Sequence, residues 1–277
     1  MIVYLAVTVT LAPVQLFGLV AYRPLAVRLP RFYHALCCRL LGFQVVRRGR
    51  ISRTRPTLFV GNHSSYLDIM VYGGLIAGSF VAKTEVAGWP LFGWLAKMQR
   101  TVFVDRRRGS TRAQRDEIVR RLEAGDNLIL FPEGTSNDGN RVLPFRSALF
   151  SVAERGTVRL RGPEGGERPL TVQPVSIAYT RLNGFPIGHA LRPYFAWYGE
   201  MGLASHLWRA LGLGRVTVVV EFHRPVTIDE FGSRKALAEH CHQVVADGVA
   251  AALSGYTPPR ALSRFRRRRA DETSTAA

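Results

Sequence analysis

His63 and Asp68 are the residues whose types and spacing could carry out acid–base chemistry. They lie five positions apart, in a stretch that begins at Val60. Five residues of a continuous helix turn through about 140°, so two fully helical side chains at this spacing would not meet. They meet if His63 lies in a turn and Asp68 lies in the first turn of a following helix. The carboxylate could then hold one imidazole nitrogen while the other takes a proton from a hydroxyl group.

The sequence around the pair supplies the elements that this geometry requires. The apolar run Thr57–Val60 predicts a buried strand, and Ile69–Ile76 predicts a helix. Between them, Asn62, Ser64 and Ser65 are residue types that favour turns and helix N-caps. A His and an Asp at this spacing are also compatible with a structural histidine at a capped helix start, so the rest of the chain must separate the two interpretations.

Composition restricts the class of protein. The chain has 277 residues, of which 47% are hydrophobic and 21% charged, values typical of a globular protein with a sizeable core. Its net charge of +18 favours polyanionic partners, namely nucleic acid, anionic membrane or phosphorylated substrates. The three cysteines, Cys37, Cys38 and Cys241, offer neither a disulfide framework nor the spacing of a zinc site. A reducing compartment and no metal are therefore expected.

The first residues predict a membrane-embedded segment. Met1–Tyr22 contains no charged residue and is long enough to cross a bilayer, although a proline and a glutamine within it also permit a re-entrant helix. Arginines follow this run, so the positive-inside tendency predicts a main domain that faces the cytoplasm from the cytoplasmic membrane. Pro24 and Pro30 are expected to interrupt the chain before a second apolar helix over Arg31–Gly42. An ordinary N-terminal core helix is the alternative.

From residue 57 the sequence alternates between short apolar runs and helical stretches. This alternation predicts an α/β fold with a central, mostly parallel or mixed sheet covered by helices. We assign residues 1–50 to an N-terminal membrane-associated helical segment, 51–257 to the main domain and 258–277 to a basic disordered tail. The predicted strands are Thr57–Val60, Ser79–Ala82, Thr101–Val104, Asn127–Phe131, Thr171–Tyr179 and Val216–Phe222, and the predicted helices are Ser65–Ile76, Trp89–Met98, Thr111–Ala124, Ser147–Glu154 and Arg234–Leu253.

Two of these strands end in residues that suit chemistry. Thr101–Val104 runs into Asp105 and a series of arginines, and Arg106 is placed to bind a phosphate group through its planar, bidentate guanidinium. Asn127–Phe131 runs into a Pro-Glu-Gly sequence, where glycine permits a tight turn and Glu133 is expected to be exposed. Binding groups often lie at such strand ends in α/β sheets. A solvated strand end and a plain turn are the simpler alternatives.

A proline interrupts another apolar run. Pro174 lies inside the predicted strand Thr171–Tyr179. Because proline cannot donate a hydrogen bond to a neighbouring strand, an edge strand or a bulge is expected there. Such a position could line a groove for a ligand.

In order and spacing, these motifs resemble those of the glycerolipid acyltransferase family, whose best-known members acylate lysophosphatidic acid. The family shows a His-x4-Asp motif, then a Phe and an Arg near a strand end, then Phe-Pro-Glu-Gly-Thr, then a hydrophobic motif with a proline. Any one motif is common, whereas four in order are specific. The matching residues, within about residues 40 to 225, are His63 and Asp68, Phe103 and Arg106, Phe131 to Thr135, and Val172 to Val175.

The resemblance implies transfer of a fatty acyl group from a thioester to the free hydroxyl of 1-acylglycerol-3-phosphate, giving phosphatidic acid. It implies His63 as general base and Asp68 as the residue that orients it, with backbone N–H groups near the helix start as candidates for binding the oxyanion. No cofactor is implied beyond acyl-coenzyme A or acyl-acyl carrier protein as co-substrate. Membrane lipids, and acyl carrier protein where it is the donor, are the implied partners. The implied substrate-binding residues are Phe103, Arg106, Glu133, Gly134, Thr135 and Arg146.

Several positions depart from the family pattern. Thr101 stands where glycine is typical, Ser136 where many members carry arginine or lysine, and Arg146 and Ala148 where lysine and glycine are common. These departures leave the His–Asp pair unchanged but bear on the headgroup of the acceptor. The stretch 133–141 also resembles the branch that acylates lyso-ornithine lipid, so this acceptor is an alternative.

A function of another class is a non-catalytic membrane protein that binds anionic lipid. The net charge permits this, and the arginine-rich run 264–269 could attract such lipids, but neither explains the ordered motifs. Nucleic-acid binding is not expected, because aromatic residues are not interleaved with the basic run. His240 and His242 flank Cys241 on a predicted helix, where residues two apart do not share a face, so a metal site is not expected there.

Overall fold

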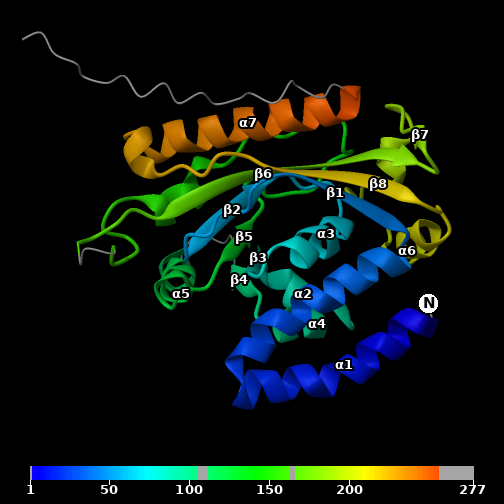
Figure 1. The fold of residues 1–277 in the computed structure, drawn as a ribbon, viewed down its shortest axis with the longest axis horizontal. Coiled ribbons are helices and arrows are strands. Elements are labelled where there is room, and N and C mark those ends of the chain that lie inside the picture. Colours follow the sequence, from blue (N-terminus) through cyan, green and yellow to red (C-terminus); the bar gives the residue numbers. More distant parts are fainter. Residues whose placement is uncertain (1, 105–110, 163–165, 256–277) are drawn as a thin grey trace, which may run out of the picture.

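The computed structural model describes residues 2–104, 111–162 and 166–255, which form a mixed sheet with helices on both faces (Figure 1). Within these residues eight strands make the sheet, in the order β1-β8-β6-β2-β5-β3-β4, with β7 paired to β6. Neighbours along this path are parallel except β6 and β8. The α/β fold predicted from the sequence is therefore confirmed. The strands are β1 (Phe43–Gly49), β2 (Thr57–Gly61), β3 (Ser79–Lys83), β4 (Val102–Val104), β5 (Leu128–Leu130), β6 (Thr171–Leu182), β7 (Phe185–Pro186) and β8 (Val216–Phe222).

The helices cover the two faces of the sheet unequally. Figure 1 shows α7 over one face, whereas α3, α2 and α1 lie beneath the opposite face, with α1 farthest from the sheet. Within the described part of the chain the α-helices are α1 (Ile2–Ala21), α2 (Arg23–Leu40), α3 (Leu67–Leu75), α4 (Phe92–Met98), α5 (Thr111–Glu123), α6 (Leu203–Leu211) and α7 (Arg234–Ser254), and the 3₁₀ segments are η1 (Thr84–Gly88), η2 (Ser147–Ala153), η3 (Arg192–Tyr194) and η4 (Ile228–Glu230).

Strand side chains alternate between two hydrophobic cores. Phe59 of β2 packs with residues of α2 and α3, whereas Leu58 and Val60 pack with residues of α7 and η2. Successive strand residues point to opposite faces, so a strand covered on both sides must be apolar throughout. Every residue of β2 is buried. The strand that leads into the His–Asp pair is therefore held on both faces.

Several elements were not predicted from the sequence, among them one strand of seven residues and one α-helix. Residues 43–49 form β1, an edge strand parallel to β8, and so belong to the sheet rather than to the N-terminal helical segment 1–50. Arg47 and Arg48 mask its apolar alternation, as charged residues do on many edge strands. Helix α6 was also missed, and residues 147–153 form a 3₁₀ segment where an α-helix was expected.

Of the two prolines expected to interrupt the chain, Pro24 lies at the break between α1 and α2, whereas Pro30 does not break its helix. Pro24 occupies the first turn of α2, where a missing N–H group is tolerated. Pro30 lies within α2, which runs unbroken from Arg23 to Leu40. The predicted interruption at Pro30 is therefore wrong, because packing on its neighbours holds α2 together despite the lost hydrogen bond.

Pro174 lies inside the sheet. Strand β6 has β2 on one side and β8 on the other, and Pro174 pairs with Val60 of β2. The predicted edge position is thus wrong. The ladder to β8 is nevertheless irregular at this point, since residues 223–225 lie opposite residues 173–174 before pairing resumes. An extra residue in the neighbouring chain accommodates the proline.

Helix α1 turns its large apolar side chains outward. Ile2 is 84% and Val20 is 90% exposed, whereas the buried residues of the helix are Thr8, Gln15 and Gly18. The helix is long and apolar enough to cross a membrane. Only 17% of its apolar stretch is buried in the protein. This pattern is the inverse of that of a soluble amphipathic helix. A membrane-associated helix would present such an apolar face to lipid.

Substitution of Val9 by aspartate is expected to weaken membrane association about 100-fold. Val9 is 71% exposed on α1, and a carboxylate near the middle of an embedded helix costs about 2.5–3.5 kcal/mol. The matched control is Val46→Asp, which places the same charge on an exposed valine of β1. Sedimentation of the full-length protein with liposomes at high salt measures the effect. Equal binding of the native and Val9→Asp proteins would show that α1 lies outside the bilayer.

Candidate active site

The turn at residues 62–66, between β2 and α3, carries the candidate site, and we call it the His–Asp turn. Gly61 ends β2, and a Cβ atom there would lie 2.4 Å from the Tyr72 hydroxyl, so no side chain fits. Asn62 pairs with Ile177 of β6 in both directions. Its Nδ2–H group donates to the Ile177 carbonyl at 2.9 Å, and its Oδ1 accepts the Ile177 N–H at 2.8 Å. The amide thus fixes the start of the turn to the neighbouring strand.

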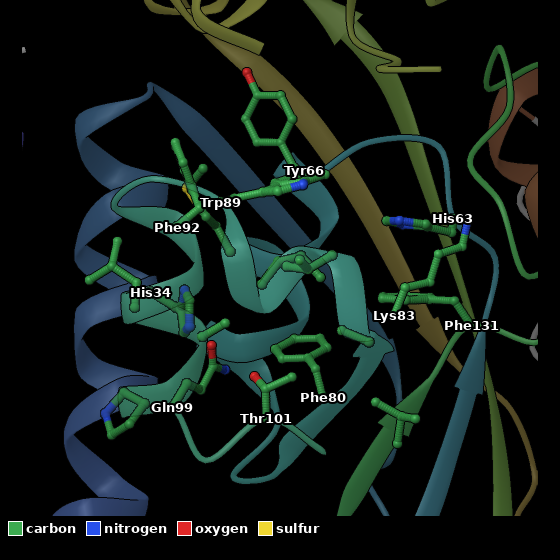
Figure 2. A pocket seen from close by; sticks show the side chains of 18 of the residues that line it. His34, His63, Tyr66, Phe80, Lys83, Trp89, Phe92, Gln99, Thr101 and Phe131 are labelled. Atoms are coloured by element: carbon green, nitrogen blue, oxygen red, sulfur yellow. The ribbon is translucent and has the colours of Figure 1, made fainter. Parts of the chain in front are cut away.

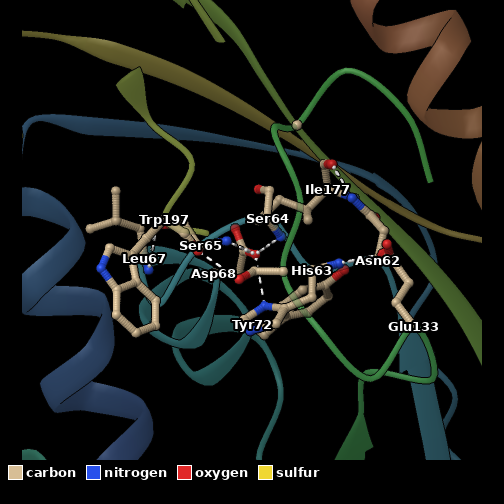
Figure 3. Close-up of polar contacts among 12 residues, drawn as sticks. Asn62, His63, Ser64, Ser65, Leu67, Asp68, Tyr72, Glu133, Ile177 and Trp197 are labelled. Carbon is tan, nitrogen blue, oxygen red and sulfur yellow. Dashed lines mark hydrogen bonds and ion pairs between the residues drawn. The ribbon is translucent and has the colours of Figure 1, made fainter. Parts of the chain in front are cut away.

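The side chains of His63 and Asp68 meet at this turn (Figure 3). His63 Nδ1 lies 3.1 Å from Asp68 Oδ2, which also accepts the N–H groups of Ser64 at 2.7 Å and Ser65 at 2.9 Å. Asp68 Oδ1 accepts the Tyr179 hydroxyl at 2.8 Å. Asp68 is fully buried, and these partners fix the orientation of its carboxylate. Because Asp68 holds Nδ1–H, Nε2 is the nitrogen of His63 that can accept a proton.

Tyr179 is a site residue that no sequence motif marked. It lies on β6, 111 positions after Asp68. Burial, followed by the neighbouring Asp68 carboxylate, raises the pKa of Tyr179 well above its usual value. The phenol therefore keeps its proton and acts as a donor to Asp68.

The imidazole of His63 packs flat on the ring of Phe131. The two ring centroids are 4.2 Å apart and the planes differ by 11°. Phe131, the residue after β5, in turn contacts Phe80 and Tyr72. The His63 side chain remains 22% exposed. Phe131 thus sets the plane of the ring while Asp68 sets its rotation, and the outer nitrogen stays accessible.

Glu133 is buried, although its place after a strand predicted exposure. It is 2% exposed, because the loop after it folds back and donates to its carboxylate. Oε1 accepts the His63 N–H at 2.8 Å, and Oε2 accepts Asn137 Nδ2–H at 2.6 Å and the Leu143 N–H at 2.9 Å. The expected exposure is therefore wrong. In this position Glu133 joins the backbone of the His–Asp turn to the loop 134–143.

Glu133 should make stability depend on pH. Burial raises its pKa to about 7, against the lowering effect of the hydrogen bonds that it accepts. Since this lies above the ordinary value of 4.5, protonated Glu133 stabilises the fold most below pH 4.5, and the contribution disappears as the pH rises to about 7. We expect the free energy of unfolding of the native protein, relative to Glu133→Gln, to fall by about 3 kcal/mol across this window. Denaturant unfolding in detergent at several pH values tests this, and a constant difference would contradict it.

Three backbone N–H groups of the turn are already engaged. His63 N–H donates to Glu133, and those of Ser64 and Ser65 donate to Asp68. The N–H groups at the helix start were the first candidates for binding a tetrahedral oxyanion. An oxyanion at this site would therefore need donors other than these three.

Trp197 links the His–Asp turn to the loop after β5. Its N–H group donates to the Ser64 carbonyl at 2.8 Å, and its carbonyl accepts Ser136 Oγ–H at 2.6 Å. Its indole contacts the rings of Tyr66 and Trp89 edge to face. The segment between β7 and α6 that carries Trp197 has no motif, so the sequence did not mark it. Trp197 nevertheless binds both the His–Asp turn and the loop after β5 through its backbone.

An apolar cavity of about 460 Å³ begins beside His63 (Figure 2). Phe80 and Phe131 line it, together with aliphatic side chains of α1, α2 and α4. Figure 2 shows His34 and Gln99 at the opposite end from His63. The cavity thus offers a proton acceptor at one end and room for a long apolar group beyond it.

The other residues predicted for the site fall into three groups. Gly134 and Thr135 line the cavity. Arg146 is exposed, and among the described residues neither it nor Phe103 lines the cavity. Arg106 lies outside the described residues. The substrate-binding roles of all of these residues stay predictions.

The cysteines are not suited to nucleophilic chemistry. Burial raises the pKa of Cys37 to about 11 and that of Cys38 and Cys241 to about 12, so the thiols stay protonated. In the part of the chain that the structure describes, no group of three or more His, Cys, Asp or Glu side chains could hold a metal ion.

Comparison with known proteins places the chain among acyltransferases. A family model described as Acyltransferase matches residues 42–178. A lyso-ornithine lipid O-acyltransferase of Brucella abortus (strain 2308) is 43% identical over 257 residues, covering 92% of this chain and 94% of the relative. One of Rhizobium meliloti (strain 1021) is 38% identical over 252 residues, covering 90% and 84%. A 1-acyl-sn-glycerol-3-phosphate acyltransferase of Neisseria gonorrhoeae is 29% identical over 220 residues, covering 77% and 78%.

A solved structure shares the fold. The crystal structure of the 1-acyl-sn-glycerophosphate (LPA) acyltransferase PlsC from Thermotoga maritima matches with a TM-score of 0.63 at 24% identity, covering 90% of this chain and 92% of that chain. The family model and the relatives confirm the family resemblance of the sequence motifs. From the family model and the relatives that match over nearly the whole chain, we conclude that this chain belongs to the acyltransferase family.

Proposed function

We propose that this protein is a membrane-associated O-acyltransferase that acylates the free hydroxyl group of a lyso-ornithine lipid. The observation that carries the proposal is the His63–Asp68 pair at the end of the apolar cavity. A buried carboxylate orients an accessible imidazole, and the cavity beside it suits a fatty acyl chain.

The pair supplies general acid–base catalysis in this proposal. His63 Nε2 takes the proton of the acceptor hydroxyl as its oxygen attacks the thioester carbonyl. The resulting imidazolium returns the proton to the departing thiolate when the tetrahedral intermediate collapses, giving an ester and a free thiol. Asp68 holds the ring and stabilises its positive charge. The donor is acyl-coenzyme A or acyl-acyl carrier protein, the latter being a partner protein, and no covalent acyl-enzyme or further cofactor is needed.

The headgroup separates the two candidate acceptors. The sequence motifs favoured lysophosphatidic acid, which carries a phosphate, whereas ornithine carries a carboxylate and an ammonium group. Ser136, where many family members carry a cation, is bound to the Trp197 carbonyl. Among the described residues that line the cavity, Lys83 is the one with a permanent charge. One lysine suits one carboxylate, and the relatives of higher identity are named for lyso-ornithine lipid, which supports that acceptor.

An acceptor assay tests the proposal. Membranes that contain the native protein or His63→Ala receive a labelled acyl thioester, on coenzyme A or on acyl carrier protein. Lyso-ornithine lipid and lysophosphatidic acid are offered in parallel. We expect label in ornithine lipid that depends on His63. Label in phosphatidic acid would change the acceptor and keep the chemistry, whereas label in neither would favour a lipid-binding role.

Lys83→Met is expected to raise KM for the acceptor about tenfold with little change in kcat. This is the lower end of the effect of losing a hydrogen bond to a charged group, as suits an exposed lysine. The matched control is Lys97→Met, an exposed lysine of α4 that does not line the cavity. Initial rates over a range of acceptor concentrations measure both. An unchanged KM in Lys83→Met would place the headgroup elsewhere.

We also propose that the catalytic domain faces the cytoplasm from the cytoplasmic membrane. Arginines follow α1 and acyl thioesters are cytoplasmic metabolites, so this orientation brings donor and site together. Protease cleavage of the domain in inverted membrane vesicles, with protection in right-side-out vesicles, is the expected result.

A further inference from the structure

A second cavity, away from the His–Asp pair, is lined by positive charge. It has a volume of about 210 Å³ and lies where the first turn of α2 meets the loop between α5 and β5. Arg23, Arg55 and Arg100 line it, and Asp126 contributes one carboxylate. We call it the arginine cavity.

Three guanidinium groups share the single carboxylate of Asp126. Arg100 lies 2.6 Å and Arg121 2.7 Å from Oδ2, and Arg23 lies 3.2 Å from Oδ1. One negative charge cannot balance three positive ones, and Arg55 adds a further charge nearby. Burial lowers the pKa of Arg100, and the neighbouring Arg121 and Arg23 lower it further, against the opposite effect of Asp126. The cavity therefore keeps an excess of positive charge.

Two backbone features accompany this excess of positive charge. Helix α2 begins at Arg23 with no acidic residue in its first turn, so the positive end of its dipole lies uncompensated at the cavity. Arg100 has a left-handed backbone with φ of 63°, which is uncommon for a residue other than glycine. Such a conformation persists where the surrounding structure enforces it. Here it accompanies a guanidinium held against Asp126.

We propose that the arginine cavity binds the phosphate group of an anionic membrane lipid. Guanidinium groups match phosphate oxygens in a planar, bidentate geometry. The position of the cavity favours a lipid over free phosphate, because Arg23 follows directly after α1, whose outer face is apolar. An embedded α1 places the corner between α1 and α2 at the depth of the headgroups. Figure 1 shows this corner on the side of the molecule where α5 lies.

A lipid phosphate in this position would tie the membrane helices to the catalytic domain. It would contact α2 through Arg23 and the loop before β4 through Arg100, and it would relieve the repulsion between the arginines. The proposal goes beyond acyl transfer, since the site needs neither a hydroxyl group nor a thioester. It can be tested by binding alone.

Binding is measured on the full-length protein in a zwitterionic detergent, by displacement of a fluorescent phosphatidylglycerol. Unlabelled phosphatidylglycerol, phosphatidylcholine and inorganic phosphate are the competitors. We expect phosphatidylglycerol to displace the probe at a concentration about tenfold or more below that of the other two. Equal displacement by inorganic phosphate would overturn the assignment to a lipid. Equal displacement by phosphatidylcholine would overturn the requirement for a net negative headgroup.

Single charge removals locate the site. Arg23→Gln and Arg55→Gln should each weaken phosphatidylglycerol binding about tenfold. Arg28→Gln removes the same charge from an exposed position of α2 outside the cavity, and should weaken binding less than about threefold. Arg55→Gln keeps the three ion pairs of Asp126, so it remains informative if Arg23→Gln fails to fold. Equal losses in Arg28→Gln and Arg55→Gln would overturn the proposal by showing a general attraction to basic residues.

Discussion

His63→Ala is expected to lower kcat/KM for acyl transfer by about 10²–10⁴-fold. The substitution removes both the group that takes the hydroxyl proton and the group that returns it to the thiolate. The cavity and its other lining residues remain, so KM for the acceptor should change little. Initial rates with purified protein in mixed micelles measure both constants.

His240→Ala is the matched control for His63→Ala. His240 lies on α7, on the opposite face of the sheet from α3, and its ring packs on Phe231. We expect the rate of acyl transfer by His240→Ala to stay near that of the native protein. Native-like turnover in His63→Ala would rule out the general-base role, and equal losses in both variants would point to damage of the fold instead.

Asp68→Asn is expected to lower kcat on the order of 10³-fold while the fold persists. An asparagine can keep the geometry. Its amide oxygen can accept from His63, Ser64 and Ser65, and its NH₂ group can face Tyr179, whose hydroxyl can also accept. What it cannot supply is the negative charge that stabilises the imidazolium. Initial rates of the native and variant proteins measure the loss of catalysis, and their thermal unfolding shows whether the fold persists.

Two companion variants complete this test. Asp68→Ala removes both the charge and the hydrogen bonds, so it should lose stability as well as rate, since buried donors are left unpaired. Tyr179→Phe removes one hydrogen bond to Asp68 and keeps the charge of the carboxylate. We therefore expect kcat to fall about five- to tenfold. Full activity in Asp68→Ala would show that His63 acts without this partner.

The sequence predicted the centre of the fold better than its edges. β2 and β6 are covered on both faces, so their apolar runs stand out from the flanking polar residues. β1 has a neighbour on one side only, so its exposed positions carry charges and hide its period. Pro30 was misleading because tertiary contacts of α2 outweigh its local cost. Pro174 correctly indicated an irregular ladder but not an edge strand, because β6 has neighbours on both sides.

The site was predictable where its contacts are local. His63 lies in a turn with recognisable turn residues and Asp68 in the first turn of the helix that follows, so their spacing was enough to suggest that they meet. Tyr179 and Trp197 reach the same turn from distant parts of the chain, and no local pattern states which strand will be the neighbour. The burial of Glu133 depends on how the following loop folds back, which residue types alone do not reveal.

The supports of the His–Asp turn come late in the order of synthesis. Asn62 needs Ile177, 115 positions later, and Asp68 needs Tyr179, 111 positions later. Helix α1, by contrast, precedes β2 in the chain, so its apolar outer face is complete before β2 has been made. Since chains fold progressively from the N-terminus as they are translated, α1 can reach the bilayer while the catalytic turn still lacks its partners. The active site would therefore be completed at the membrane surface, where its lipid substrates reside.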